Sequence, residues 1–441
     1  MTNRWAIGIA GMIVMICLGT IYSWSIFVQP LRASFGWSNT ATTWIFAWSI
    51  FFLGLGAVVG GRWQDRVGPR TVTLTGVLLW AAGYLLAGLG AKLGPWWMYL
   101  TYGLIAGFGN GMAYITPVAT VTKWFPDMRG VGSGMVVMGF GLGAFFYNQI
   151  VPRIASFADA SKAAAAFLKA KADTTGATIP VPLTPDQVQA VLNIFVISGI
   201  VFLVIGGACA LLLNNPPDGY TVPGAKALAA STARSYTTAE MLHTSQFYLL
   251  WLMLFINVTA GILVISNAVP IILELTNKAV AGAVDPKTAG TAYGLVAIFN
   301  GLGRFFWGSI SERIGRNWAF ALIFGIQAVI FFILGSLTSL TLVLVCFAIV
   351  LLCYGGGFGT MPSFNADYFG TKYLGANYGA ILTAWGCAGI VGPIFVAYVK
   401  DHLGSFAPAL PYVGGMLAIA TILPFLTRRP ADSTAPAAAT A

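Results

Sequence analysis

Uninterrupted apolar stretches of about twenty residues recur along the whole chain, and no other feature constrains its fold as strongly. A helix of that length crosses a hydrocarbon layer of about 30 Å. Charged residues make up only 8% of the 441 positions, whereas a soluble domain carries roughly 25%. We therefore expect an all-α integral membrane protein. The first stretch, 5–30, is too long for the core of a signal peptide and is interpreted as a retained span.

The stretches predict twelve transmembrane helices in two bundles of six. The predicted spans are 5–30, 41–61, 71–92, 95–122, 130–154, 188–213, 244–274, 289–310, 318–337, 340–364, 375–399 and 408–427. They divide the chain into an N-terminal bundle (1–213) with an outer insertion (156–187), a cytosolic linker (214–243), a C-terminal bundle (244–429) and a disordered tail (430–441). The linker is rich in Pro, Gly, Ala, Ser and Thr, which is typical of flexible connections.

Three local patterns predict further helices outside the spans. An alanine-rich run at the start of the insertion predicts a short helix. Capping boxes at Thr184–Gln187 and Thr237–Glu240 predict helix starts at the end of the insertion and just before the seventh span.

Basic residues concentrate on one predicted side of the membrane. With the N-terminus in the cytosol, the inner segments hold Arg62, Arg66, Arg70, Lys123, Arg129, Lys226, Arg234, Arg313, Arg316, Lys372, Arg428 and Arg429. The outer loops hold Arg32, Lys92, Lys278, Lys287 and Lys400. This positive-inside asymmetry predicts that both termini are cytosolic. It also accounts for the net charge of +10 without nucleic acid as a partner, because no basic stripe interleaved with aromatic residues accompanies it.

One loop motif, G-x-x-x-[D/E]-R-x-G, occurs after the second span and again after the eighth. Its defining positions are Gly61, Asp65, Arg66 and Gly68, and then Gly308, Glu312, Arg313 and Gly315. The glycines allow a tight turn, the acid can meet the N-terminus of a helix, and the arginine can anchor to lipid headgroups. Because the motif repeats in register, it indicates two equivalent six-helix units, and we predict that these residues act in conformational change.

This repeated loop resembles the signature loop of the major facilitator superfamily. The resemblance implies two six-helix halves that rock around a site near the bilayer midplane. Segments 22–24, 123–130, 240–242 and 300–308 are similar to the oxalate/formate antiporter family and the related monocarboxylate transporters. The closer resemblance implies a multi-pass transporter of small carboxylate anions in a bacterial inner membrane.

Arg304 is the only ionised side chain well inside a predicted span. It precedes Glu312 at the cytosolic edge by eight residues, which places it about 12 Å deep, where a charge costs at least about 2.5–3.5 kcal/mol. Apart from Asp367, no Asp or Glu is expected within the spans. A substrate carboxylate held by two parallel hydrogen bonds is therefore the expected counterion. The alternative is a structural arginine bonded to backbone carbonyls or reaching along a crevice.

Other substrate-binding candidates surround this position. Asn300 precedes Arg304 by one helical turn and shares its face. Tyr114 precedes Lys123 by nine residues, which gives it a depth of about 13 Å in the opposite half. Further aromatic candidates are Tyr22, Tyr354, Phe358, Tyr378 and Trp385. Helix packing or lipid contact is the alternative role for each aromatic residue.

These observations predict a secondary active transporter of small monocarboxylates, of the lactate, pyruvate or formate class, that works by alternating access. Oxalate antiporters place a second basic residue in the eleventh span, whereas residues 374–399 contain no Lys or Arg here. We expect proton-coupled symport. No proton carrier is assigned, because Asn300 stands where monocarboxylate transporters often have an acid. An oxalate/formate-type antiporter and a non-transporting membrane anion receptor are the alternatives. We expect a monomer, with no enzymatic activity, cofactor or metal.

Overall fold

The computed structural model describes residues 3–172, 183–217, 219–222, 234–278, 283–403 and 405–430. Within these ranges the regular structure is entirely helical, as the apolar pattern predicts. Three predicted segments fall partly or wholly outside the described residues: the insertion at 173–182, the middle of the linker (223–233) and the tail from 431.

Six crossings precede the linker. They are α1 (Arg4–Gly19) with η1 (Thr20–Ser23) and α2 (Ser25–Phe35); α3 (Asn39–Val67); α4 (Pro69–Gly90) with η2 (Ala91–Leu93); α5 (Pro95–Met98), η3 (Tyr99–Ala106) and α6 (Gly107–Trp124); α7 (Arg129–Ile150) with η4 (Val151–Arg153); and α9 (Pro185–Ala210). The predicted helix of the insertion is α8 (Ala155–Ala172).

Six crossings follow the linker and the short α10 (Thr238–Leu242). They are α11 (Ser245–Thr276); α12 (Pro286–Val296) with α13 (Ile298–Ile314); α14 (Arg316–Leu334); α15 (Leu340–Phe369); α16 (Leu374–Ile381) with α17 (Thr383–Leu403); and α18 (Ala409–Ala420) with α19 (Leu423–Leu426). Among the described residues, eleven crossings are by themselves long and apolar enough to span a membrane. The pair α12 and α13, interrupted at Ala297, makes the twelfth.

Local sequence signals set several helix ends. The capping boxes at Thr184–Gln187 and Thr237–Glu240 are confirmed at the starts of α9 and α10. In the repeated loop, Gly68 directly follows the end of α3 and Gly315 the end of α13, each with φ of 86°. Only glycine adopts this backbone conformation without strain, so the last glycine of the motif is a requirement of the turn.

One acid, Asp367, lies in a membrane helix as expected, and another, Glu274, lies inside a span where none was predicted. α15 continues through Pro362 to Phe369 and therefore contains Asp367 beyond its predicted end at 364; proline is tolerated within membrane helices. Glu274 lies in α11, and its carboxylate accepts hydrogen bonds from the Phe406 and Ala407 amides just before α18. The expectation that the spans hold no acid apart from Asp367 was therefore wrong.

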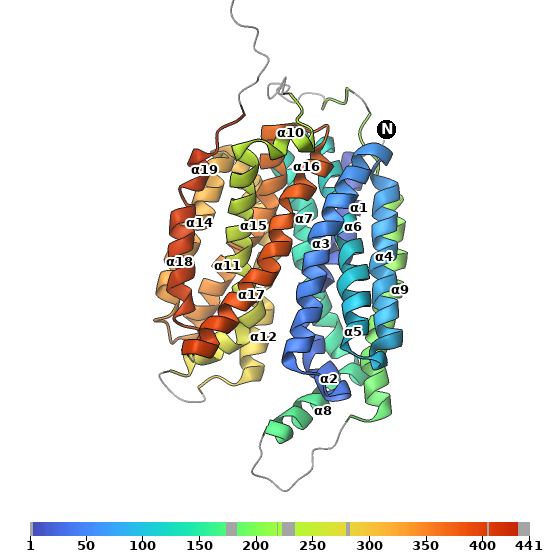
Figure 1. Cartoon of the computed structure of the whole chain (residues 1–441), viewed down its shortest axis with the longest axis vertical. Coiled ribbons are helices and arrows are strands. Elements are labelled where there is room, and N and C mark those ends of the chain that lie inside the picture. The colour runs from blue at the N-terminus through green and yellow to red at the C-terminus, as the bar shows by residue number, and fades with distance from the viewer. Residues whose placement is uncertain are drawn as a thin grey trace, which may run out of the picture.

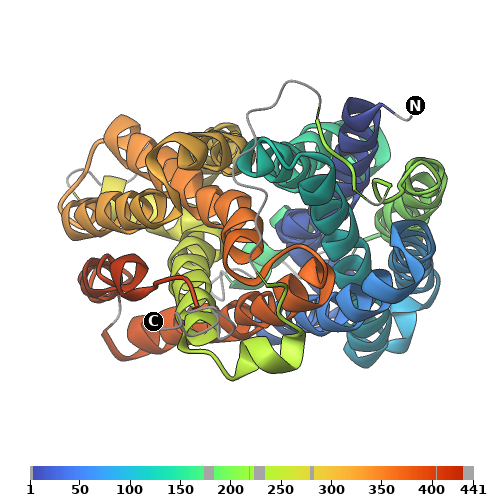
Figure 2. The same ribbon diagram turned by 90° about the horizontal axis from the view of Figure 1, so that it is seen from above.

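The crossings before and after the linker form two groups that stand side by side (Figure 1, Figure 2). The groups meet where α7 packs on α13 and where α3 packs on α16 and α17. Glycines permit these contacts: a methyl group on Gly141 would lie 2.5 Å from Cα of Gly301. A methyl group on Gly375 would likewise lie 2.8 Å from the carbonyl oxygen of Gly61.

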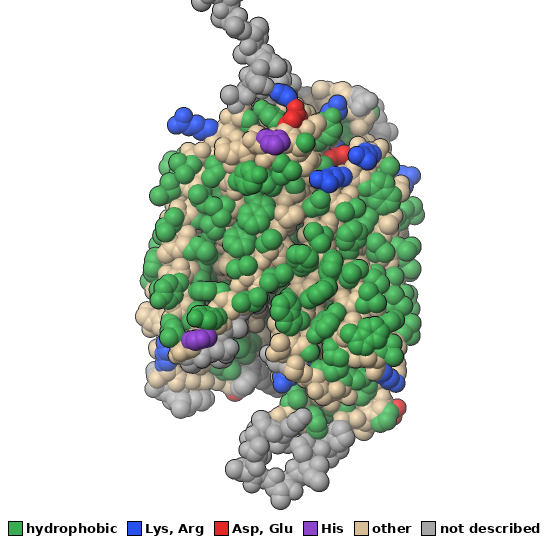
Figure 3. Space-filling view, viewed as in Figure 1, with side chains coloured by type: hydrophobic (Ala, Val, Ile, Leu, Met, Phe, Trp, Pro, Cys, Tyr) green, Lys and Arg blue, Asp and Glu red, His purple; other side chains and the backbone are tan. Residues whose placement is uncertain are grey.

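Apolar side chains cover the visible flank of the molecule, and charged side chains gather at its two ends (Figure 3). The start of α1, α10 and the end of α19 lie at one end, which we call the terminal end, and α8 lies at the opposite end (Figure 1). An even number of crossings brings the start of α1 and the end of α19 to the same side in this way.

Candidate functional site

Arg304 is fully buried in α13, between the two groups of helices. Its Nε donates to Oδ1 of Asn300 over 3.3 Å, and its Nη1 donates to the Val137 carbonyl of α7 over 3.5 Å. Both distances are at the long end for hydrogen bonds. Its Nη2 is buried without a partner, and no acid in the described part of the chain forms an ion pair with it. The guanidinium is therefore incompletely satisfied by the protein.

Two phenylalanine rings flank this cation. The Cζ atom of Arg304 lies 5.2 Å from the ring centre of Phe140 in α7 and 4.8 Å from that of Phe358 in α15. Ring faces attract a cation at this range, by about 0.5–2 kcal/mol for each contact. The rings partly compensate the charge and leave the open edge of the guanidinium free for hydrogen bonding.

Aromatic residues from both groups of helices close the space around the cation. Trp385 of α17 packs against Tyr114, Phe140 and Phe358, with ring centres 5.3, 5.4 and 4.7 Å apart. The hydroxyls of Tyr22 in η1 and Tyr354 in α15 lie 2.6 Å apart, which joins one group of helices to the other. Tyr22 is the most exposed of these residues, at 9%. The enclosure is therefore shut off from solvent.

Polar hydrogens inside the enclosure lack acceptors. The hydroxyls of Tyr114 and Tyr378 and Nε1 of Trp385 are buried and have no hydrogen-bond partner among the described residues, as is the case for Arg304 Nη2. Tyr378 lies beside Tyr114, and Tyr114 beside Arg304, without hydrogen bonds of normal geometry between them. Leaving a buried donor unsatisfied costs roughly 1–3 kcal/mol. Three such donors beside a cation that has an unpaired donor of its own fit a small anion that carries acceptor oxygens.

The structure thus brings together all eight residues that the sequence singled out for binding: Arg304, Asn300, Tyr114, Tyr22, Tyr354, Phe358, Tyr378 and Trp385. Sequence reasoning missed Phe140, although it touches Arg304, Tyr22 and Tyr114. It lies in the glycine-rich stretch 134–143, where nothing distinguishes a phenylalanine facing the site from one facing lipid.

The two acids of the repeated loop make equivalent contacts at the terminal end. Oδ2 of Asp65 accepts from the Ala376 amide at the start of α16 over 2.8 Å, and Oε1 of Glu312 accepts from the Gly130 amide at the start of α7. Each carboxylate therefore caps a helix of the opposite group, where the helix dipole favours negative charge. Among the described residues, Arg66 and Arg313 are exposed and form no ion pair.

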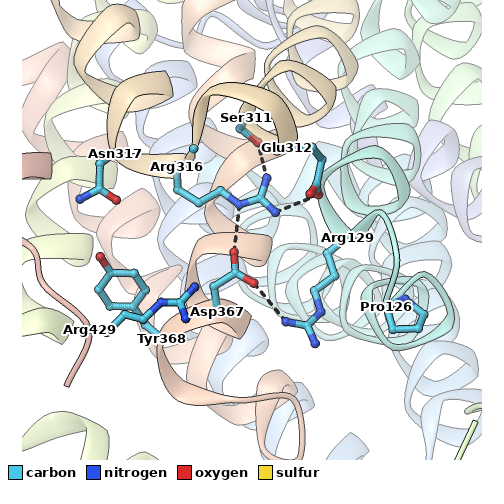
Figure 4. Close-up of a pocket in the computed structure, with 10 residues that line it drawn as sticks. Pro126, Arg129, Ser311, Glu312, Arg316, Asn317, Asp367, Tyr368 and Arg429 are labelled. Atoms are coloured by element: carbon cyan, nitrogen blue, oxygen red, sulfur yellow. Dashed lines mark hydrogen bonds and ion pairs between the residues drawn. The ribbon is translucent and has the colours of Figure 1, made fainter. Parts of the chain in front are cut away.

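A further ion-pair network joins the groups beside Glu312 (Figure 4). Asp367 accepts from Nη1 of Arg129 through Oδ1 and from Nε of Arg316 through Oδ2, both over 3.0 Å. Arg129 belongs to α7 and the other two residues to α15 and α14. The sequence did not reveal this network, because its members lie up to 238 positions apart.

The architecture and the contacts at the terminal end define the class of protein: a membrane transporter made of two six-helix units that meet around a buried polar centre. The sequence model of the Major Facilitator Superfamily matches residues 9–284 and 250–441 of this chain. The chain belongs to this superfamily.

Two curated relatives and one solved structure are similar over most of the chain. The oxalate:formate antiporter of Oxalobacter formigenes is 29% identical over 405 residues, which cover 91% of this chain and 86% of that protein. The apicoplast pyruvate carrier 1 of Toxoplasma gondii is 25% identical, and the aligned region covers 84% of this chain and 79% of that protein. The fucose:proton symporter of Escherichia coli aligns with a TM-score of 0.68 at 15% identity, covering 96% of this chain and 98% of that one. The last comparison supports the fold alone.

Proposed function

We propose that the protein is a secondary active transporter of small organic monocarboxylates of the lactate, pyruvate or formate class. The observation that carries the proposal is the buried guanidinium of Arg304, which lacks an acidic partner in the described part of the chain and keeps an unpaired Nη2. A carboxylate would supply both the missing charge and the missing acceptors. The relatives named for pyruvate and for oxalate and formate support a small carboxylate anion as the substrate.

In the proposed complex, Nη2 of Arg304 and the three unpaired donors of Tyr114, Tyr378 and Trp385 bind the carboxylate oxygens. Asn300 orients the guanidinium through its bond to Nε. The rings of Phe358 and Phe140 and the Tyr22–Tyr354 pair form the wall beside the carbon chain.

A single fixed cation favours one carboxylate over two. The second acidic group of oxalate would lie among aromatic rings, because α16 and the first part of α17 carry no Lys or Arg before Lys400. Carboxylate exchange of the oxalate/formate type is the alternative, and the identity with the Oxalobacter antiporter favours it. The two differ in coupling, since exchange needs a counter-anion and symport needs a proton.

Alternating access would move the bundles 1–213 and 244–429 against each other across this site. We propose that Asp65 and Glu312 hold the terminal end closed in the state described here, and that this end faces the cytosol of a bacterial inner membrane. A single chain contains both halves of the site, so a monomer suffices.

The test is uptake of radiolabelled lactate, pyruvate, formate and oxalate into proteoliposomes, with and without an inward proton gradient. Uptake of a monocarboxylate that the gradient drives supports symport. Uptake that requires a counter-anion inside supports the antiport alternative. Uptake of none of the four, in vesicles that contain correctly folded protein, would refute the proposed substrate class.

A further inference from the structure

A second polar cavity lies at the terminal end, apart from the Arg304 site (Figure 4). Its volume is about 490 Å³, and it is lined by Pro126, Arg129, Ser311, Glu312, Gly315, Arg316, Asn317, Asp367, Tyr368 and Arg429. The lining comes from both groups of helices. We call it the terminal cavity.

The acids of the terminal cavity are already used by neighbouring groups. Asp367 gives one oxygen to Arg129 and the other to Arg316. Oε1 of Glu312 accepts from Nη2 of Arg316 over 2.8 Å and from the amide of Gly130. Nη1 of Arg316 donates to Ser311, so each nitrogen of this guanidinium has a partner. The charge of each carboxylate is therefore offset by a paired arginine.

Two arginines of the cavity keep donors that the described residues do not use. Arg129 donates there only through Nη1, to Asp367, and its side chain is 18% exposed. Arg429 makes no hydrogen bond or ion pair within the described part of the chain, and in Figure 4 it lies on the opposite side of Asp367 from Arg129. The lining carries three arginines against two acids, so the excess charge is positive.

The start of α14 adds to this field. Gly315 and Arg316 line the cavity, and the 19-residue helix that begins there has neither a side-chain cap nor an acid in its first turn. The free amides at a helix start carry partial positive charge and bind anions. In contrast, the start of α7 is capped by Glu312.

We propose that the terminal cavity is a regulatory site for a phosphate group. A tetrahedral dianion offers oxygens in several directions and can contact Arg129, Arg429 and the first amides of α14 together. Because Arg129 belongs to one group of helices and Arg429 and α14 to the other, the bound group holds the terminal end closed. It therefore binds the closed state more tightly than a state in which these residues separate, and it slows opening. The phosphate comes from a soluble compound or from the headgroup of an anionic phospholipid.

The first arm of the experiment titrates inorganic phosphate into the purified full chain in detergent, against sodium chloride of equal ionic strength, and follows the unfolding temperature. Phosphate should raise it, and Arg429→Gln should weaken phosphate binding about tenfold or more. Arg429 has no internal partner among the described residues, so this variant should fold normally. Arg428→Gln is the matched control, because Arg428 is exposed and does not line the cavity.

The second arm uses nanodiscs of phosphatidylcholine with or without phosphatidylglycerol, and it follows the alkylation rate of Ser363→Cys. Ser363 is fully buried and lies 3.0 Å from Ser133 across the two groups of helices, so its alkylation reports opening of the terminal end. Slower alkylation with phosphatidylglycerol that Arg429→Gln abolishes assigns the phosphate to a lipid headgroup. A response only to inorganic phosphate assigns it to a soluble compound. No response in either arm would overturn the proposal, and so would an equal loss of the phosphate or lipid effect in Arg428→Gln and Arg429→Gln. Neither arm depends on the transported substrate.

Discussion

Replacing Arg304 by methionine separates its role in binding from a role in stability. Methionine fills much of the same volume without charge. In the unliganded protein Arg304 gains two long hydrogen bonds, at 3.3 and 3.5 Å, and two cation–π contacts. Burying an ion that is poorly paired costs several kcal/mol, which is comparable to those gains. We therefore expect Arg304→Met to leave the unfolding temperature without ligand unchanged or to raise it.

The same substitution should weaken anion binding strongly. Charge-assisted hydrogen bonds contribute about 1.5–3 kcal/mol, so the Kd for the carboxylate should rise by roughly tenfold to a hundredfold. Arg304→Lys keeps the charge but loses the planar two-pronged donor, and we expect an intermediate loss.

Both effects are measured by titrating each anion into purified protein and following heat and unfolding temperature. The reasoning is refuted if Arg304→Met binds every anion as well as the unaltered protein does. It is equally refuted if the variant loses several degrees of stability without any ligand, because Arg304 would then be a structural residue satisfied by the protein.

Three further predictions concern the enclosure, the repeated loop and the topology. Trp385→Phe keeps the ring packing but removes the unpaired Nε1, so the affinity for the carboxylate should fall about fivefold in a binding titration. Trp80→Phe is the control, because it removes a buried unpaired indole away from the site and should leave this affinity unchanged. Glu312→Gln removes a charged cap between the groups of helices, so carboxylate exchange in proteoliposomes should slow while the equilibrium affinity for the carboxylate stays within about twofold. Asp159→Asn is the control, because Asp159 is an exposed acid of α8. In a cysteine-free background, an impermeant thiol reagent applied to intact cells should label Lys162→Cys in α8 and spare Arg428→Cys, and the reverse pattern would show that the terminal end faces outward.

The sequence was sufficient for the architecture because its signals are local. Twenty-residue apolar stretches define the crossings, and the predicted ends lie within a few residues of most observed ones. The glycine that ends each repeated loop is required by a positive φ at Gly68 and Gly315. The break at Ala297 between α12 and α13 has no comparable signal, because no proline or glycine occupies that position.

Arg304 could be found in the sequence because a charge inside an apolar span is rare and costly. Asn300 followed from helical spacing. Phe140 could not be found, because its role depends on how α7 packs against α13 and α15. The same holds for the two arginine partners of Asp367, which come from other helices. Contacts between distant segments depend on packing, and a residue pattern along one chain does not encode them directly.

The most direct test of the central claim is counterflow of radiolabelled pyruvate in proteoliposomes loaded with unlabelled pyruvate. A carrier with one site that opens to each side in turn exchanges the label and accumulates it transiently inside the vesicles, even without a proton gradient. We predict such an overshoot for the unaltered protein, a reduced one for Arg304→Lys and none for Arg304→Met. An equal overshoot in Arg304→Met, or the absence of any overshoot with pyruvate, lactate and formate alike, would contradict the account.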